Sequence, residues 1–295
     1  MSASANDWVD AFLRREALPD SYRDVIASHV VPLGDELTAA ARDLDRPLSL
    51  GICGAQGSGK STLAAALAAL LGARGLTVAA LSLDDFYLTR AERAQLARDV
   101  HPLLATRGVP GTHDVPLATR TFAQLAKAGD TALPSFDKAI DDRRDPAQWP
   151  RVRGPADVVL FEGWCVGARP QTAAALATPI NALERDEDAG GQWRRTVNDA
   201  LAGPYRPLFD GFDRLLLLQA PSFEVVFEWR REQEQKLARK LAASGGDGNA
   251  LMDEAQLARF IAHYERLTRH ILEEMPARAD ILFTLDSRRH LTRRR

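Results

Sequence analysis

The chain contains little cysteine, and this scarcity limits what kind of protein it can be. Only two cysteines occur among its 295 residues, Cys53 and Cys165. Two cysteines cannot form a disulfide framework, and their spacing suits no zinc site. Each ends an apolar, strand-like run, where a buried free thiol is common. The sequence therefore predicts a protein of a reducing compartment.

The chain also lacks a strong net charge and long apolar runs. Its net charge is −2, so it has no overall positive field that would attract nucleic acid. Its longest apolar run, Leu63 to Leu71, is too short to cross a bilayer, and Met1 to Asp7 lack the pattern of a secretion signal. We expect a cytoplasmic protein with neither a nucleic-acid nor a membrane partner. We expect Arg293 to Arg295 to be a short solvated tail.

What the chain does contain is a phosphate-binding pattern. Residues 54–61, with the sequence GAQGSGKS, fit G-x-x-x-x-G-K-[ST] at every fixed position. An apolar run over 48–53 precedes the loop, and a run rich in Ala and Leu follows it as far as Leu71. The order strand, glycine loop, helix places phosphates at a helix N-terminus. The sequence therefore predicts a nucleotide site.

Each residue type in this loop has a physical role. Glycines allow positive φ and bring backbone N–H groups against phosphate oxygens. The pattern assigns Lys60 to the β- and γ-phosphates and the Ser61 hydroxyl to Mg²⁺. The residues expected to bind the nucleotide are Gly54, Gln56, Gly57, Ser58, Gly59, Lys60, Ser61 and Thr62.

Apolar runs also predict the fold class. Near-continuous apolar runs are typical of parallel strands that are covered on both faces. Helical stretches lie between these runs, so we expect an α/β fold with right-handed crossovers. The predicted strands are 48–53, 77–83, 157–161, 214–219 and 280–285.

The remaining segments predict how the chain is divided. Residues 1–45 are expected to form a helical extension, broken at Pro19 and Pro32 and packed on a main domain over 46–295. Two connections are long enough to indicate functional segments: 86–156, with a helix near 117–128, and 164–212, with a helix near 193–201. Two later segments, 222–243 and 254–274, have helical patterns. The glycine-rich residues 245–248 between them are predicted to form a flexible tip.

Acidic residues follow two of the predicted strands, at the edge where parallel strands place ligands. Asp84 and Asp85 follow the second strand, and Glu162 ends the third. Neighbouring acids on an extended chain point to opposite sides, so only one of the pair is expected to face the phosphates, as a base or a Mg²⁺ ligand. Glu162 is expected on the Mg²⁺ side. The competing interpretation is that these acids cap helices or lie in solvent.

Cations in two charged loops and one helix can clamp an anionic molecule. Arg107 and Lys138 are the stronger candidates in the loops, whereas His113 can equally be a surface histidine and Asp114 can cap the helix that follows it. The helix over 222–243 can close over phosphates and supply an arginine to the transition state. The competing interpretation is that the basic residues of this helix form a solvated face with i,i+4 ion pairs.

Taken together, these segments resemble the D-glycerate 3-kinase family, which is similar in turn to pantothenate kinase, uridine kinase and phosphoribulokinase. The match runs in order from about residue 46 to residue 286. Its most specific part is Asp84–Tyr87 combined with Gly108–Asp114. The segments that carry it are Gly54–Ser61, Ser82–Leu88, Arg107–Asp114, Pro134–Lys138, Phe161–Gly163 and Trp229–Glu234.

The resemblance implies a P-loop kinase fold, with three α/β/α layers around a five-stranded parallel core. It implies transfer of the γ-phosphoryl group of ATP, with Mg²⁺, to a hydroxyl of a small hydroxy acid, D-glycerate being the favoured acceptor. By similarity, Asp84 is the catalytic base with Asp85 in reserve, and Arg230 is the lid arginine that acts with Lys60. The implied Mg²⁺ ligands are Ser61, Asp84 and Glu162, and the implied substrate contacts are Asp85, Tyr87, Arg107, His113 and Lys138.

Two alternatives stay open at this point. One is a P-loop kinase for another acceptor, such as pantothenate or a nucleoside. The other is an ATPase or nucleotide switch that acts on a protein partner. The chain has no N-K-x-D guanine-binding pattern and no LSGGQ segment, and its long polar connection over 86–156 favours a small-molecule pocket.

Overall fold

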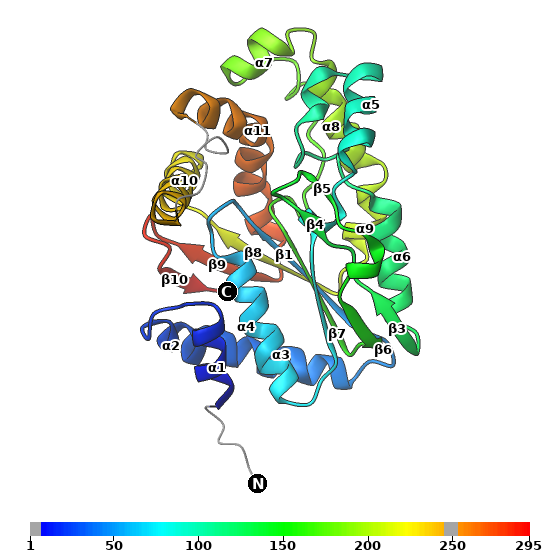
Figure 1. The fold of residues 1–295 in the computed structure, drawn as a ribbon, viewed down its shortest axis with the longest axis vertical. Helices are drawn as coiled ribbons and strands as arrows, with labels where there is room; N and C mark the ends of the chain where they lie inside the picture. The colour runs from blue at the N-terminus through cyan, green and yellow to red at the C-terminus, as the bar shows by residue number, and fades with distance from the viewer. Residues whose placement is uncertain (1–6, 245–252) are drawn as a thin grey trace.

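The structure, a computed structural model, describes residues 7–244 and 253–295. Its centre is one sheet that lies between two layers of helices (Figure 1). The helices are α1 (Asp7–Arg15), α2 (Tyr22–Val25), α3 (Val31–Arg42), α4 (Lys60–Ala73), α5 (Arg90–Asp99), α6 (Val115–Leu125), α7 (Ala182–Glu187), α8 (Gln192–Ala202), α9 (Tyr205–Asp210), α10 (Phe223–Ser244) and α11 (Glu254–Arg278).

The sheet contains the predicted parallel core and one further strand. Its strands are β1 (Leu48–Gly54), β2 (Val78–Ser82), β7 (Val158–Gly163), β8 (Arg214–Gln219), β9 (Ile281–Leu285) and β10 (Leu291–Arg294). They lie in the order β10-β9-β8-β1-β7-β2, and only the pair β10–β9 is antiparallel. The prediction of five parallel core strands is therefore confirmed.

Successive residues of the central strands face opposite helical layers. In β1, Leu50 and Ile52 join a hydrophobic cluster with α1, α3 and α4, whereas Cys53 joins a second cluster with α6, α9 and α11. Burial of both faces explains why the strands are near-continuous apolar runs. Cys53 and Cys165 are both buried and unpaired, as predicted. The predicted three-layer architecture is confirmed.

The N-terminal segment forms helices, but only one of the two predicted breaks occurs. The break at Pro19 is confirmed, because it lies between α1 and α2. The break at Pro32 is wrong, because a π-helical segment, Ile26–Val30, joins α2 to α3. Pro32 is the second residue of α3, directly after the π-helical segment, and the helical run continues past it.

These N-terminal helices are part of the central packing. Phe12 of α1 and Leu33 of α3 are buried in the cluster that also covers β1 and α4. The division of the chain into an extension over 1–45 and a kinase domain over 46–295 stays a prediction.

The connection over 86–156 is more ordered than its sequence predicts. The expected helix is α6, and Asp114 caps it, since its Oδ1 accepts a hydrogen bond from Leu117 N at 2.9 Å. Two small antiparallel sheets are added, whose strands are too short to show a period in the sequence. They pair β3 (Gly129–Ala132) with β6 (Arg151–Gly154), and β4 (Phe136–Asp137) with β5 (Asp142–Arg143).

The C-terminal arginines do not form the solvated tail that the sequence predicts. Arg293 and Arg294 belong to β10, which pairs with β9 at the edge of the sheet, and the backbone of Arg295 exchanges hydrogen bonds with that of Leu282 in β9. Arg294 lies 2.5 Å from Glu36 of α3, and its guanidinium lies 5.9 Å from the centre of the Phe283 ring. The sequence conceals this strand because Leu291 is its only apolar residue.

The later helices match their patterns. α8 confirms the helix predicted near 193–201, and α10 and α11 confirm those predicted over 222–243 and 254–274. The predicted flexible tip, Gly245–Gly248, lies outside the described residues.

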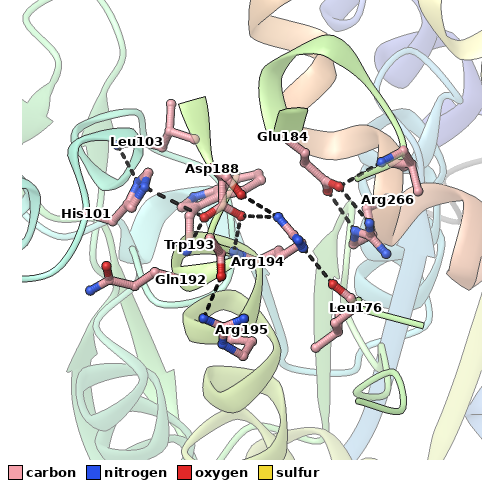
Figure 2. Close-up of polar contacts among 12 residues, drawn as sticks. His101, Leu103, Leu176, Glu184, Asp188, Gln192, Trp193, Arg194, Arg195 and Arg266 are labelled. Atoms are coloured by element: carbon pink, nitrogen blue, oxygen red, sulfur yellow. Dashed lines mark hydrogen bonds and ion pairs between the residues drawn. The ribbon is translucent and has the colours of Figure 1, made fainter. Parts of the chain in front are cut away.

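Two buried ion pairs hold α7, α8 and α11 together (Figure 2). Arg266 of α11 donates to both carboxylate oxygens of Glu184 in α7, at 2.7 and 2.6 Å. Arg194 of α8 lies 2.9 Å from Asp188, which follows α7. Both arginines also donate to backbone carbonyls of residues 175–178. Paired charges thus fix a segment that has no regular secondary structure of its own.

Replacing Arg266 by Ala tests this network. The change leaves Glu184, whose side chain is 0% exposed, without its partner. Removing one member of a buried pair costs about 3–5 kcal/mol, so we expect the free energy of unfolding in urea to fall by about that amount. The control is Arg185→Ala, because Arg185 and Asp186 are 67% and 60% exposed and such pairs contribute less than about 1 kcal/mol. Equal losses in the two variants would contradict the prediction.

Candidate active site

The phosphate-binding loop lies between β1 and α4, at the carboxyl end of a central strand. Gly57 and Gly59 have φ of 78° and 87°, a region that favours glycine. A Cβ on Gly54 would lie 2.6 Å from the Ser58 hydroxyl oxygen, so a side chain there would clash. α4 begins at Lys60, and the N–H groups of a first helical turn have no partner within the helix. The loop is therefore suited to bind an anion.

Glu162, at the end of β7, contacts the start of α4. The Ser61 hydroxyl donates to Glu162 Oε1 at 2.8 Å, and Lys60 Nζ lies 3.9 Å from Glu162 Oε2. Glu162 is 8% exposed, and its Oε2 accepts no hydrogen bond from the described residues. A buried carboxylate oxygen of this kind beside a serine hydroxyl fits the oxygen ligands that Mg²⁺ prefers. Asp84, the third predicted ligand, lines the same cavity.

Asp84 lies directly after β2, in the 3-10 turn η2 (Leu83–Phe86). Its carboxylate accepts hydrogen bonds from the Tyr87 hydroxyl at 2.7 Å and from the Lys138 ammonium at 2.6 Å. Burial raises the pKa of Asp84, but the charges of Lys138 and Lys60 and these hydrogen bonds outweigh it and lower the pKa to about 2. The carboxylate is therefore ionised at neutral pH.

Asp85 has a different environment from its neighbour. Its Oδ1 accepts a hydrogen bond from Phe136 N in β4 at 3.2 Å. Burial raises the pKa of Asp85 to about 6, and the charge of Asp84 adds to this rise. The structure does not bring Asp85 to the cavity, contrary to the predicted substrate contact, because its carboxylate binds the backbone of β4 instead. The expectation that only one acid of the pair faces the phosphates agrees with this geometry.

His113 is buried rather than open to a substrate. It is 5% exposed, and its Nδ1 lies 2.6 Å from the Tyr205 hydroxyl. Its ring stacks on Tyr87, with centroids 4.8 Å apart. Burial lowers the pKa of His113 to about 4, so the ring is neutral at physiological pH. The predicted substrate contact is not supported. His113 instead packs against Tyr87, which binds Asp84.

The two predicted loop cations both line the cavity. Arg107 forms an ion pair with Asp141, and its guanidinium lies 5.7 Å from the centre of the Phe136 ring. Lys138 is 60% exposed and pairs with Asp84. Arg230 of α10 also lines the cavity, and its guanidinium lies 5.7 Å from the centre of the Phe260 ring. Positive charge therefore surrounds the space in front of Asp84.

These elements enclose one cavity of about 660 Å³, a size typical of a small-molecule site. The predicted site residues in its lining are Gln56, Gly57, Gly59, Lys60, Ser61, Thr62, Asp84, Tyr87, Arg107, Lys138, Glu162 and Arg230. The predicted residues outside its lining are Gly54, Ser58, Asp85 and His113. The lining residues to which the sequence analysis gives no role are Leu18, Ser82, Trp164, Phe260, Tyr264 and Arg289.

Most of these further residues leave little trace in the sequence. Trp164 is an exception, since it comes directly after β7, two positions beyond Glu162. The glycine at position 108 is an indirect sign of Tyr264. Gly108 has a φ of 120°, and a Cβ there would lie 2.3 Å from the Tyr264 hydroxyl. Leu18 and Arg289 come from turns near opposite ends of the chain, and no local pattern marks them.

Known proteins are similar to this chain in sequence and in fold. The model of the phosphoribulokinase/uridine kinase family matches residues 49–169. An uncharacterized kinase of Schizosaccharomyces pombe is 35% identical over 256 residues, which are 83% of this chain and 85% of that protein. The chloroplastic D-glycerate 3-kinase of Arabidopsis thaliana is 33% identical over 235 residues, 74% of this chain. The chain spans only 46% of that plant enzyme.

A solved structure extends this likeness to the fold. The D-glycerate 3-kinase of Cryptococcus neoformans superposes with a TM-score of 0.71 at 26% identity, over 91% of this chain and 99% of that one. The chain belongs to the D-glycerate 3-kinase family. Membership confirms the P-loop kinase fold and a phosphotransferase activity toward an alcohol group, and it implies the use of ATP. Within the described residues, no helix combines the length and apolarity needed to span a bilayer.

Because the buried His113 ring is neutral, the stability of the folded protein depends on pH. The folded pKa of about 4 lies below the ordinary value of 6.5, so the unfolded chain binds the proton first as the pH falls. The resulting stabilisation, about 3 kcal/mol, is fully present above pH 6.5 and is lost as the pH falls through about 4. We expect His113→Gln to lose less stability than the wild type between about pH 7 and about pH 4.5 in urea denaturation.

The control for this prediction is His290→Gln, because the His290 side chain is 71% exposed. This variant should keep the pH dependence of the wild type. If His113→Gln also keeps it, the buried imidazole is not the group responsible.

Proposed function

We propose that this protein transfers the γ-phosphoryl group of ATP to a hydroxyl of D-glycerate. The observation that carries the proposal is the meeting, in one cavity, of the phosphate-binding loop, the buried acid Glu162 and the ionised acid Asp84. Two relatives that are D-glycerate 3-kinases support this acceptor. The cations Arg107 and Lys138 beside Asp84 suit an acceptor that carries a carboxylate.

On the nucleotide side, the chain supplies donors for the phosphates. The N–H groups of residues 57–61 and the Lys60 ammonium bind phosphate oxygens. Ser61 and Glu162, with Asp84 nearby, would hold Mg²⁺, which offsets charge on the phosphoryl oxygens when bound. The orphaned Glu162 Oε2 supports this assignment. Arg230, from α10, adds positive charge toward the same oxygens.

On the acceptor side, Asp84 orients the attacking hydroxyl and takes its proton. A carboxylate with a pKa of about 2 is a weak base, so most of its effect is to position the hydroxyl, and the proton moves late as the new bond to phosphorus forms. Arg107 and Lys138 offset the charge of the glycerate carboxylate. Catalysis of this kind is mainly positioning and electrostatic stabilisation rather than covalent chemistry.

Asp84→Asn tests the base assignment. The amide keeps the shape of the side chain but cannot take a proton, so we expect kcat to fall by about 10²- to 10³-fold. Binding of ATP, followed by calorimetry, should change much less. The control is Asp85→Asn, which removes the neighbouring carboxylate outside the cavity and should lower kcat far less. A larger loss of kcat in the Asp85 variant would reverse the assignment.

The acceptor is tested by measuring ADP release in the presence of different alcohols. The panel contains D-glycerate, pantothenate and uridine, with a reaction that lacks acceptor as the baseline. We expect D-glycerate to give the highest kcat/KM, because its small carboxylate and hydroxyl match the cations beside Asp84. A higher value with pantothenate or uridine would move the protein to another acceptor. Slow turnover that no alcohol changes would favour a nucleotide switch.

A further inference from the structure

The loop that carries Arg107 has no helix or strand of its own. It connects the 3-10 turn η3 (Pro102–Ala105) to α6, so its buried backbone groups need partners from elsewhere in the fold. Two aromatic side chains supply partners for neighbouring carbonyls. The Tyr264 hydroxyl of α11 donates to Arg107 O at 2.9 Å, and the indole N–H of Trp164 donates to Gly108 O at 2.7 Å. Side chains from distant parts of the chain therefore fix the backbone at Arg107.

The two aromatic rings hold each other in place. Their centroids are 4.9 Å apart and their planes are inclined by 82°, an edge-to-face arrangement. Tyr264 and Trp164 both line the cavity, although they are only 4% and 3% exposed. A Cβ on Gly108 would lie 2.3 Å from the Tyr264 hydroxyl, so a side chain there would force the hydroxyl to move. The hydroxyl therefore has one well-defined position, against the carbonyl of Arg107.

The side chain of Arg107 is fixed by a different element. Its guanidinium pairs with Asp141, in the turn of the β4–β5 hairpin, and lies 5.7 Å from the centre of the Phe136 ring. Asp141 has a second partner, because the buried Arg93 lies 2.9 Å from its carboxylate. Arg107 thus connects α11, which holds its backbone, to the hairpin, which holds its guanidinium.

The helix that carries Tyr264 also supports the arginine of α10. Phe260 lies one turn before Tyr264 in α11, and the centroids of the two rings are 5.1 Å apart. The guanidinium of Arg230 lies 5.7 Å from the centre of the Phe260 ring. The ring of Tyr264 therefore packs on the side of Arg230, whereas its hydroxyl serves Arg107. Removing the hydroxyl alone separates these two roles.

We propose that Tyr264 is a positioning residue for the acceptor, because its hydroxyl fixes the backbone of Arg107 and thereby directs the guanidinium toward the acceptor carboxylate. The inference rests on the proposed function, which gives Arg107 that carboxylate to bind. A guanidinium binds a carboxylate in a fixed, planar geometry, so a small shift of the arginine backbone weakens the contact. Tyr264 acts through Arg107 and does not itself bind the acceptor.

Tyr264→Phe tests this role, because it removes the hydroxyl and keeps the ring. We expect the KM for D-glycerate to rise about three- to tenfold, as for the loss of one hydrogen bond. We expect kcat, and the Kd for ATP measured by calorimetry, to change by less than about twofold. The control is Tyr22→Phe, since Tyr22 is half-buried on the hydrophobic cluster of the N-terminal helices and lies outside the cavity lining. The control should leave all three values unchanged.

A double-mutant cycle tests whether Tyr264 acts through Arg107. Arg107→Met removes the guanidinium and keeps an unbranched side chain, while Asp141 retains its ion pair with Arg93. This change alone should raise the KM for D-glycerate at least about tenfold, because a charged hydrogen-bond donor is lost. In that background, Tyr264→Phe should change the KM by less than about twofold. An equal rise in both backgrounds would mean that Tyr264 acts independently of Arg107, and would overturn the inference.

These measurements separate the inference from the proposed function. If the wild type does not phosphorylate D-glycerate, the proposed function fails and the inference fails with it. If the wild type does so but Tyr264→Phe leaves the KM for D-glycerate unchanged, the inference alone is overturned. It is also overturned if Tyr264→Phe weakens ATP binding as much as it raises that KM, since the effect is then one of general packing.

Discussion

The site depends on the parallel pairing of β7 between β1 and β2. The register places Glu162 beside Ile52 of β1 and Ser82 of β2, so the three strands end at one edge of the sheet. Each strand then delivers one component: the phosphate-binding loop, Glu162 and Asp84. Because side chains alternate along a strand, a slip of one residue in β7 would turn Glu162 to the opposite face. Its contacts with Lys60 and Ser61, at 3.9 and 2.8 Å, exist only in the observed register.

Features that depend on residues close in the sequence could be predicted. The glycine loop is one, since the positions that need positive φ, Gly57 and Gly59, and the helix start at Lys60 lie within one short pattern. The five core strands are another, because burial on both faces requires continuous apolar runs. The cap at Asp114 depends on an N–H only three positions away. The resemblance to a known family added the expected activity and the roles of these residues.

Features that depend on distant partners could not be predicted. β10 has almost no apolar signal, and it is a strand because the edge of β9 accepts it and Glu36 pairs with one of its arginines. Leu18 and Arg289 reach the cavity through the packing of the two chain ends. That Asp85 and His113 lie outside the cavity lining could not be predicted for the same reason. The sequence contains no sign of the β4 backbone that binds Asp85 or of the Tyr205 hydroxyl that binds His113.

The adjacent acids illustrate how packing assigns chemistry to identical side chains. Asp84 has a pKa of about 2 and Asp85 one of about 6, and the largest attraction on Asp84 comes from Lys138, 54 positions away. The β4–β5 hairpin that carries Lys138 therefore keeps Asp84 ionised, whereas burial raises the pKa of Asp85. An acceptor carboxylate that draws this ammonium away from Asp84 would raise the pKa of that acid. Acceptor binding would then strengthen the base as the hydroxyl arrives, which couples recognition to proton transfer.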